Sequence, residues 1–439
     1  MRRVIYGTFW ILVYLTLALA PLFVLLLETE ERPGRGFWTE FSVALGFAGL
    51  AMMGLQFLLT ARYRMITSPY GIDVVYHFHR QISLIAFALI LAHPLIIFAT
   101  RPGSLRLLNV FQTTWQTRFG VFALLSLALV IITSIWRMNL RISYEPWRNM
   151  HGIFAIAAVT LAMAHVVSVG YYVGTPWKRA IWLTLGALWI GSLLYIRVVK
   201  PVIMLRRPYV VEEVRPERGD TYSLVLRPDG HKGMSFKPGQ FAWLTIWSSP
   251  FAIKEHPFSF SSSTMENGHL EMGIKELGDF TAQIKTIAPG TRAYLDGPYG
   301  VFSIDDNVAP GYVFLAGGIG ITPIMSMLRT LADRNDKRPI CLIYGTRTWE
   351  AATFREEIDE LSGRLNMEVI YVLEKPHEGW RGETGFVTPQ LLARHLPDNR
   401  MDLDYFICGP ELMLNAVENG LQKLGISLEN THSERFNLV

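Results

Sequence analysis

The sequence predicts a multi-domain protein: a six-helix α-helical transmembrane bundle, then an antiparallel β-barrel domain, then an α/β domain with a parallel sheet. Long apolar segments separated by short loops fill the N-terminal half, and each is long enough to cross a bilayer as a helix. The C-terminal half alternates first between strand-like runs and turns, and later between strands and helices. We place the domains at residues 1–207, 208–305 and 306–439.

Composition narrows the chemistry that the chain can perform. The 439 residues are 50% hydrophobic and include two cysteines, Cys341 and Cys408, both in the C-terminal half. Two cysteines exclude a disulfide framework, a four-cysteine iron–sulfur cluster and a Cys-x-x-Cys-His haem attachment. The net charge of +4 is modest, and the basic residues of the N-terminal half lie in short loops. This pattern indicates membrane topology and no nucleic-acid partner.

Six apolar segments are candidates for membrane spans. The first follows Met-Arg-Arg without a small-residue cleavage site, so we expect it to be retained as a helix. We expect the sixth span to be the shortest, because charged residues follow it closely. The expected spans are residues 4–27, 41–60, 75–100, 119–136, 149–172 and 179–196.

Charges in the loops predict the orientation. Lys and Arg are enriched on the side of the N-terminus, for example at Arg62, Arg64, Arg206 and Arg207. The positive-inside rule therefore places the N-terminus and the C-terminal domains in the cytoplasm, with the helices in the cell (inner) membrane. The third and fifth spans then run in the same direction.

Two histidine pairs lie in these parallel spans. His79 and His93 are 14 residues apart in the third span, and His151 and His165 have the same spacing in the fifth. Fourteen residues are nearly four helical turns, so the members of a pair share a face and lie about 21 Å apart along the axis. Side by side, the two helices would present two layers of two imidazoles. Each layer suits one b-type haem with two axial ligands, His79 with His151 and His93 with His165.

The histidines also have a simpler interpretation. A single histidine in an apolar helix usually packs or makes a hydrogen bond. Polar residues inside a membrane are costly and usually functional, and two equal spacings on two spans favour haem ligation. His77 does not fit the spacing, and we interpret it as an interfacial residue.

The C-terminal half predicts two sheets. Four runs with strand composition, residues 209–214, 221–226, 241–247 and 270–275, form the small antiparallel barrel. A short helix is expected at 278–287, and Tyr299 and Gly300 are expected to form a structural turn rather than a ligand contact. Strands at 312–316, 340–344, 368–373 and 405–408 alternate with helices, which indicates a parallel sheet.

Glycines follow the first strand of the parallel sheet. Gly317, Gly318 and Gly320 lie between this strand and a helix, where they allow a diphosphate to approach the backbone and the helix N-terminus. A glycine cluster alone is weak evidence. A second loop, Cys-Gly-Pro-Glu at 408–411, ends a later strand, and both loops would lie at the carboxyl edge of the sheet, where ligands bind.

Together these motifs resemble a known family. The paired histidines, His-Pro-Phe-Ser (256–259), Gly-Asp-Phe-Thr (278–281), Gly-Gly-Ile-Gly-Ile-Thr-Pro (317–323) and Cys-Gly-Pro (408–410) occur in this order. The chain is similar to a bacterial member of the membrane NADPH oxidase and ferric reductase superfamily. Its C-terminal half resembles the ferredoxin–NADP reductase type of FAD and NAD(P)H module.

The resemblance implies an FAD site in the barrel domain. His256 would lie by the FAD phosphates, Phe258 against the flavin, and Ser259 within reach of flavin N5. Related reductases have arginine at the position of His256, so the pyrophosphate would depend more on the Gly-Asp-Phe-Thr segment. The residues implied for FAD are His256, Pro257, Phe258, Ser259, Gly278 and Thr281.

The resemblance also implies a nicotinamide nucleotide site in the α/β domain. Arg347 follows the second strand, where a 2′-phosphate would lie, and favours NADPH over NADH. The residues implied for the nucleotide are Gly317, Gly318, Gly320, Thr322, Pro323, Arg347, Cys408, Gly409 and Pro410.

Three residues are implied at the catalytic centre. Phe436 would cover the flavin until nicotinamide displaces it, Glu434 would lie nearby, and Cys408 would sit beside the nicotinamide. Each has an alternative: Cys408 as a plain buried thiol, and Phe436 as a core residue, since in several relatives the aromatic is the last residue of the chain.

The implied activity is that of an NAD(P)H oxidase or ferric reductase-type oxidoreductase. Electrons would pass from cytoplasmic NADPH through FAD and two haems to an acceptor outside, for which we expect O2 and the product superoxide. The alternatives are a ferric chelate and a periplasmic redox protein that receives electrons from this chain. The sequence alone does not discriminate between these acceptors.

Overall fold

A computed structural model describes residues 2–26, 35–67, 70–266, 268–307 and 309–435. The chain divides into two compact units, Met1–Val199 and Lys200–Val439, and each is described by itself. The first unit is helical, and the second contains two six-stranded sheets.

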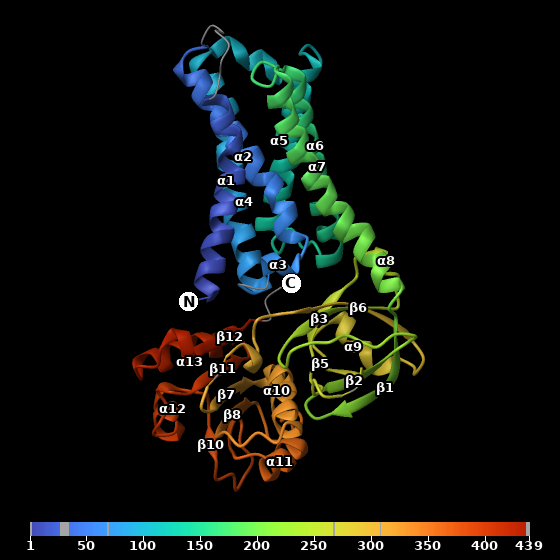
Figure 1. Ribbon diagram of the computed structural model, residues 1–439, viewed down its shortest axis with the longest axis vertical. Coiled ribbons are helices and arrows are strands. Elements are labelled where there is room, and N and C mark those ends of the chain that lie inside the picture. Colours follow the sequence, from blue (N-terminus) through green and yellow to red (C-terminus); the bar gives the residue numbers. More distant parts are fainter. Residues whose placement is uncertain (1, 27–34, 68–69, 267, 308, 436–439) are drawn as a thin grey trace. The chain divides into compact units, whose positions relative to one another are not determined.

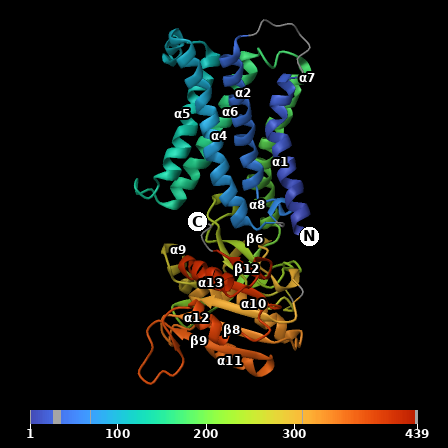
Figure 2. The ribbon, with the colours of Figure 1, turned by 90° about the vertical axis from the view of Figure 1, so that its left-hand side faces the viewer.

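Six helices of the described chain are long and apolar enough to cross a membrane, as the sequence predicts. Figure 2 shows the long helices of the first unit running side by side. A short helix α3 (Arg64–Thr67) and a 3₁₀ segment η1 (Pro102–Leu108) connect some of them. The long helices of this unit are α1 (Arg2–Leu26), α2 (Phe37–Thr60), α4 (Ile72–Thr100), α5 (Trp115–Ile135), α6 (Tyr144–Val169) and α7 (Pro176–Leu194).

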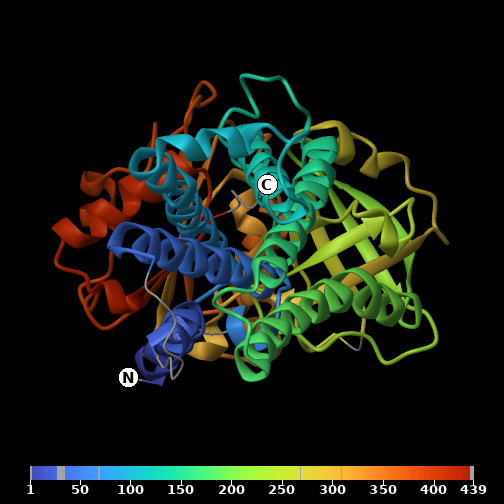
Figure 3. The same ribbon diagram turned by 90° about the horizontal axis from the view of Figure 1, so that it is seen from above.

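Within the first unit, α2 packs along α4, and α5 packs along α6. In the described residues, α4 and α6 make few close backbone contacts with each other, which leaves space for side chains between the two helix pairs. Figure 3 shows these helices from above. Close packing elsewhere depends on small residues: a Cβ at Gly54 would lie 2.1 Å from the buried indole of Trp189.

The expectation that the sixth span is the shortest is wrong. An apolar helix runs without a break from Pro176 to Leu205, and its 30 residues make it the longest candidate span. Its last part is a π-helical turn, Tyr195–Val199, followed by α8 (Lys200–Leu205). The charges of Arg197 and Lys200 end the hydropathy pattern, but they do not end the helix. Pro201 lies just after the π-helical turn, where the regular α-helical hydrogen-bond pattern is already interrupted.

The barrel domain is one antiparallel sheet with the order β4-β3-β6-β1-β2-β5. It closes on itself through a bridge between Phe260, just after β4, and Met272 on β5. A cluster of buried apolar side chains fills its interior. The strands are β1 (Tyr209–Glu217), β2 (Thr221–Pro228), β3 (Phe241–Ile246), β4 (His256–Ser259), β5 (Leu270–Lys275) and β6 (Arg292–Tyr299).

Two local expectations for the barrel are wrong. Tyr299, expected in a turn, is the last residue of β6, and the bend follows at Gly300, which has φ +102°. A bulge against β3 accommodates this segment, and Gly297 is required there because a Cβ would lie 2.7 Å from Cβ of Ala242. The helix expected at 278–287 is only α9 (Asp279–Ala282), followed by a 3₁₀ turn, Ile284–Thr286.

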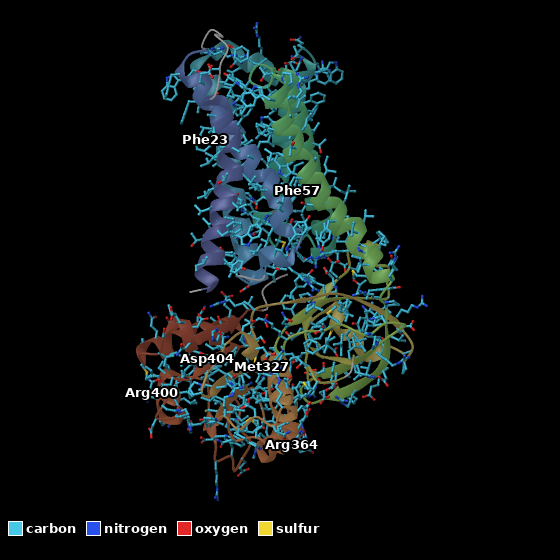
Figure 4. The ribbon with its side chains drawn as sticks, viewed as in Figure 1. Phe23, Phe57, Met327, Arg364, Arg400 and Asp404 are labelled. Carbon is cyan, nitrogen blue, oxygen red and sulfur yellow. The ribbon has the colours of Figure 1, made fainter. Side chains whose placement is uncertain are left out.

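The α/β domain has a parallel sheet with the order β10-β9-β8-β7-β11-β12. Helices cover both faces: α10 and α11 one, α12 and α13 the other (Figure 1). Met327 of α10 lies in the first of these cores, and Asp404 begins β11 (Figure 4). The elements are β7 (Tyr312–Gly317), α10 (Ile321–Asp333), β8 (Ile340–Thr346), α11 (Arg355–Arg364), β9 (Met367–Leu373), β10 (Glu383–Thr384), α12 (Pro389–His395), β11 (Asp404–Cys408), α13 (Glu411–Lys423) and β12 (Thr431–Glu434).

A buried charge network joins the barrel to α10 and α11. Arg329 donates from Nη1 to Glu271 Oε1 at 2.8 Å and from Nε and Nη2 to the carboxylate of Glu357 at 2.6 and 2.7 Å. Glu271 accepts a further bond from Arg215 at 2.7 Å. Burial alone would raise the pKa of Glu271, but the charges of Arg329 and Arg215 outweigh burial and hold this pKa below its ordinary value.

Replacing Arg329 by Met is expected to destabilise the second unit by about 3–5 kcal/mol, because it leaves Glu271 buried beside only one cation. The midpoint of thermal flavin release should fall by about 10 °C. Arg364→Met is the matched control, since Arg364 is 58% exposed and its pair with Asp333 contributes little. Equal midpoints for the two variants would contradict the role of the network.

The same network predicts a pH dependence. The folded-state pKa of Glu271 lies below its ordinary value of 4.5, so its stabilisation is complete above that pH. It is lost as the pH falls through the folded-state pKa. Glu271→Gln should therefore flatten the acid limb of flavin release, and an unchanged limb would show that other groups control it.

Candidate functional site

His79 on α4 and His151 on α6 lie opposite each other. The centroids of the two imidazole rings are 6.4 Å apart, and their planes are inclined by 64°. A metal binds an imidazole nitrogen at about 2.0–2.1 Å, so two rings that share one metal have centroids about 6 Å apart. The spacing of His79 and His151 therefore suits two axial ligands of one iron.

Both Nδ1 atoms of this pair act as hydrogen-bond donors. His79 Nδ1 lies 2.9 Å from Oε1 of Gln56, whose Nε2 donates to a backbone carbonyl one turn earlier. His151 Nδ1 lies 3.1 Å from Oγ of Ser134, which donates its own hydrogen to a backbone carbonyl at 2.6 Å. In each case the partner oxygen can only accept, so Nδ1 carries the proton and Nε2 keeps its lone pair.

The second pair follows the same rule. His93 Nδ1 lies 3.0 Å from the backbone carbonyl of Ser42, and His165 Nδ1 lies 2.7 Å from the carbonyl of Gln116. Carbonyl oxygens accept only, so here too Nε2 is left as the ligand atom. Within the described residues, no Nε2 of the four histidines makes a hydrogen bond. A donated Nδ1–H that fixes the ring is typical of metal-binding histidines.

A cavity of about 400 Å³ surrounds the second pair. Its lining is mainly apolar and comes largely from α2, α4, α5 and α6. Two glycines make room for the rings, because a Cβ at Gly46 would lie 3.3 Å from Cγ of His93, and one at Gly120 would lie 3.1 Å from Nδ1 of His165. An apolar cavity with two convergent imidazoles fits a haem. In the described residues no group of three or more histidine, cysteine or carboxylate side chains that could hold a metal occurs.

In the second unit, a cavity of about 160 Å³ brings many of the predicted residues together. It lies where β3, β4 and β5 meet the loop after β7 and the end of β12. Ser259 is 6% exposed, and its Oγ has no hydrogen-bond partner within the described residues. An unsatisfied hydroxyl beside an aromatic ring suits a polar ring system such as flavin. The predicted residues in the lining are Pro257, Phe258, Ser259, Thr281, Thr322 and Glu434.

An aromatic stack lies beside this cavity. Phe280 of α9 stacks on His256 with 3.9 Å between centroids and on Phe258 with 6.0 Å. Thr281 closes its own turn, because its Oγ1 accepts from the backbone N–H groups of Leu277 and Gly278. The sequence prediction that Thr281 and Gly278 bind pyrophosphate stays a prediction.

The glycine loop packs tightly against the end of β11. A Cβ at Gly320 would lie 2.2 Å from the carbonyl oxygen of Cys408, and one at Gly409 would lie 3.0 Å from Cα of Gly317. Gly318 has φ +53°, and its missing Cβ faces open space. Tyr344 at the end of β8 donates to the carbonyl of Gly318 at 3.2 Å and fixes the loop. The glycines therefore allow this loop to pack closely against the end of β11. That the loop binds a nucleotide diphosphate stays a prediction.

Thr322, Pro323 and Pro410 complete the predicted loop residues. Thr322 and Pro323 lie buried in the first turn of α10, and Thr322 contacts the carbonyl of Gly273 on β5. Pro410 precedes the first residue of α13.

The three predicted catalytic residues have different outcomes. Cys408 is completely buried in an apolar core, and burial together with Glu434 raises its pKa well above the usual value. Its thiol is therefore neutral and does not face the cavity. Glu434 does line the cavity, because β12 pairs in parallel with β11 and aligns Glu434 with Cys408. Phe436 lies outside the described residues.

Arg347 lies just after β8 and is exposed. Its backbone carbonyl accepts from the N–H of Lys375 at 2.8 Å, which ties the ends of β8 and β9 together. Arg347 therefore lies at the carboxyl edge of the parallel sheet. In the strand order, β7 lies between β8, which precedes Arg347, and β11, which precedes Gly409.

Several site residues were missed from the sequence. Gln56 and Ser134 orient the first histidine pair, yet both are ordinary polar residues on helices other than those of the histidines. Phe241, Phe280 and Tyr344 are aromatic residues that look like core in a one-dimensional pattern. The phenylalanine within Gly-Asp-Phe-Thr was the one available signal, because its motif was already assigned to FAD.

Comparison with known proteins defines the class. Three family models match: a ferric reductase like transmembrane component at residues 45–162, an FAD-binding domain at 212–303 and an oxidoreductase NAD-binding domain at 314–419. The chain is therefore a multi-pass membrane oxidoreductase with FAD-binding and NAD(P)H-binding domains. This arrangement is the architecture of the NADPH oxidase and ferric reductase superfamily, which the resemblance predicts, and the fold class predicted from sequence is confirmed.

Curated relatives match part of the chain. NADH-cytochrome b5 reductase 1 of Dictyostelium discoideum is 31% identical over 178 residues, which are 40% of this chain and 62% of that protein. The enzyme of the same name from Meyerozyma guilliermondii is 32% identical over 165 residues, 36% of this chain and 58% of that protein. Among solved structures, the ferredoxin reductase in carbazole 1,9a-dioxygenase is 26% identical with a TM-score of 0.46, covering 52% of this chain and 69% of that one. The match thus spans less than two thirds of these curated relatives.

Proposed function

We propose that this chain moves electrons across a membrane, from a nicotinamide nucleotide on one side to an acceptor on the other. The observation that supports this most directly is the set of four histidines on α4 and α6, each with Nδ1 committed as a donor. His79 and His151 would hold one b-type haem, and His93 and His165 a second. Haem iron exchanges single electrons, and two imidazole ligands leave no open coordination position.

The second unit would supply the electrons. Phe258 and Ser259 would hold the flavin ring, which accepts a hydride from NAD(P)H and can release its electrons singly. The Ser259 hydroxyl would donate to the ring, and the Gly317–Gly320 backbone would hold the nucleotide diphosphate. The neutral thiol of Cys408 lies in the apolar core of the α/β domain and would not act as a nucleophile.

We propose O2 as the acceptor, with superoxide as the product. Because two imidazoles would fill the iron coordination, O2 would take its electron without binding the metal. Arg35 lines the cavity of the second pair, with its guanidinium 3.3 Å from the ring centroid of Tyr171, and its charge favours an anionic product. A ferric chelate is the second candidate, favoured by the short connection between Val169 and Pro176, which leaves little chain to cover the cavity.

The acceptor assay uses the full chain in detergent, loaded with haem and FAD. NADPH-dependent reduction of cytochrome c that superoxide dismutase abolishes is expected in air. Turnover that needs ferric chelate and persists without O2 would identify the chelate, and not O2, as the electron acceptor. No turnover with either acceptor, despite reducible haem, would point to a periplasmic protein as the acceptor.

We also propose NADPH as the preferred donor. Arg347→Ser removes the only charge that we assign to the 2′-phosphate, and loss of a charge-assisted contact costs about 1.5–3 kcal/mol. The expected result is a rise in KM for NADPH of about 10- to 100-fold, with KM for NADH unchanged. A variant in which KM rises equally for NADPH and NADH would contradict the assignment of Arg347 to the 2′-phosphate. A wild-type protein that prefers NADH would contradict NADPH as the donor.

We propose that the N-terminus and the second unit lie in the cytoplasm, with the helices in the cell (inner) membrane. The excess of Lys and Arg in the loops on that side supports this orientation. In sealed spheroplasts, a reporter fused after Val439 should resist added protease. Digestion of the reporter in intact spheroplasts would reverse the topology.

A further inference from the structure

The connection between β3 and β4 carries exposed aromatic side chains. Trp247 and Phe251 in this connection are each 46% exposed. The 3₁₀ turn Pro250–Ala252, which contains Phe251, packs against α8 within the second unit. Along the chain, α8 is the last part of the apolar helix Pro176–Leu205, which is long enough to cross a membrane.

The surroundings have the composition of a membrane interface. Ile203 and Leu205 of α8 are exposed apolar residues, and Arg206 and Arg207 follow them directly. Lys254 is exposed in the same connection as Phe251. Aromatic side chains beside basic residues at the end of a span are typical of the headgroup region of a bilayer.

The backbone holds the connection in this shape. Trp247 has φ +59° and Ile253 has φ +53°, and both are non-glycine residues in the left-handed region. Such conformations cost free energy and persist where the surroundings or the function require them. Here they bracket the segment that carries Phe251.

We propose that Trp247 and Phe251 insert into the headgroup region of the lipid bilayer, in the leaflet on the side of the second unit. The partner is the lipid surface itself, and the contact continues that of the span that ends in α8. Since β4 begins at His256, directly after this connection, the lipid contact positions the strand that carries Phe258 and Ser259. This inference depends on the membrane spans and is independent of the electron acceptor.

The test places a spin label in the full chain. Cys341 and Cys408 are 2% and 0% exposed, so the native thiols should take no label. Phe251→Cys is labelled with a nitroxide in nanodiscs of phosphatidylcholine and phosphatidylglycerol. Leu428→Cys, at a position 70% exposed on the α/β domain, is the matched control. The rates at which the nitroxide collides with O2 and with a water-soluble nickel chelate report how deep the label lies in the bilayer.

We expect the label at 251 to collide more with O2 and less with the nickel chelate than the label at 428. Equal ratios at the two sites would overturn the proposal. If Phe251→Cys does not fold, Ala252→Cys, at the exposed neighbouring position, gives the same reading. Flavin content verifies folding in each variant, so failure of the proposed electron transfer and failure of the lipid contact are separate results.

Discussion

Replacing His93 by Ala is expected to abolish electron transfer across the membrane. The variant should keep the haem of His79 and His151 and lose the other, because one of two axial ligands is removed. Loss of groups that only orient ligands costs 10- to 100-fold, so loss of a ligand should reduce transfer to an outside acceptor by at least about 100-fold. NADPH-dependent reduction of ferricyanide at the flavin should stay unchanged.

His77→Ala is the matched control for this variant. His77 lies on the same helix, is exposed, and stands two residues before His79. It should keep both haems and full transfer. A His93→Ala variant with two haems and normal electron transfer would show that His93 and His165 do not hold a haem.

Replacing Gly320 by Ala is expected to disable the nucleotide site without removing FAD. The added Cβ would lie 2.2 Å from the carbonyl oxygen of Cys408 and 2.7 Å from the N of Gly409, both backbone atoms. The glycine loop and the end of β11 must move apart, at a cost of about 1–3 kcal/mol. NADPH-dependent ferricyanide reduction should fall about 10- to 100-fold, mainly through KM.

Gly363→Ala is the control for this substitution. Gly363 lies on α11, and nothing lies within 4 Å of its Cβ position. Alanine is the better helix former, so this variant should have full activity and unchanged or higher stability. If Gly320→Ala keeps the wild-type KM, the nucleotide does not bind at this loop.

The histidine pairs could be predicted because they depend on a local rule. A helix repeats every 3.6 residues, so equal 14-residue spacings place two rings on one face whatever the helix packs against. The partners Gln56 and Ser134 depend on which helix lies next to which, and this is a property of the bundle alone. The sequence therefore predicted which histidines share a helix face, but not the atoms that orient their rings.

The end of the chain shows the opposite case. The segment 431–434 is short and polar, so no alternation of apolar and polar residues predicted a strand there. They form β12 because β11 offers an unpaired parallel edge, and the register of Cys408 with Glu434 brings the carboxylate to the cavity. The sixth span failed for a related reason, since helix continuation through Arg197 and Lys200 depends on a π-turn that hydropathy does not report.

The most direct test of the account is the haem content of the purified full chain. We predict two b-type haems per chain, both low-spin in electron paramagnetic resonance, as two imidazole ligands require. Gln56→Leu should keep both haems but weaken the binding of the one held by His79 and His151. One haem, no haem, or a high-spin five-coordinate iron would contradict the four-histidine site.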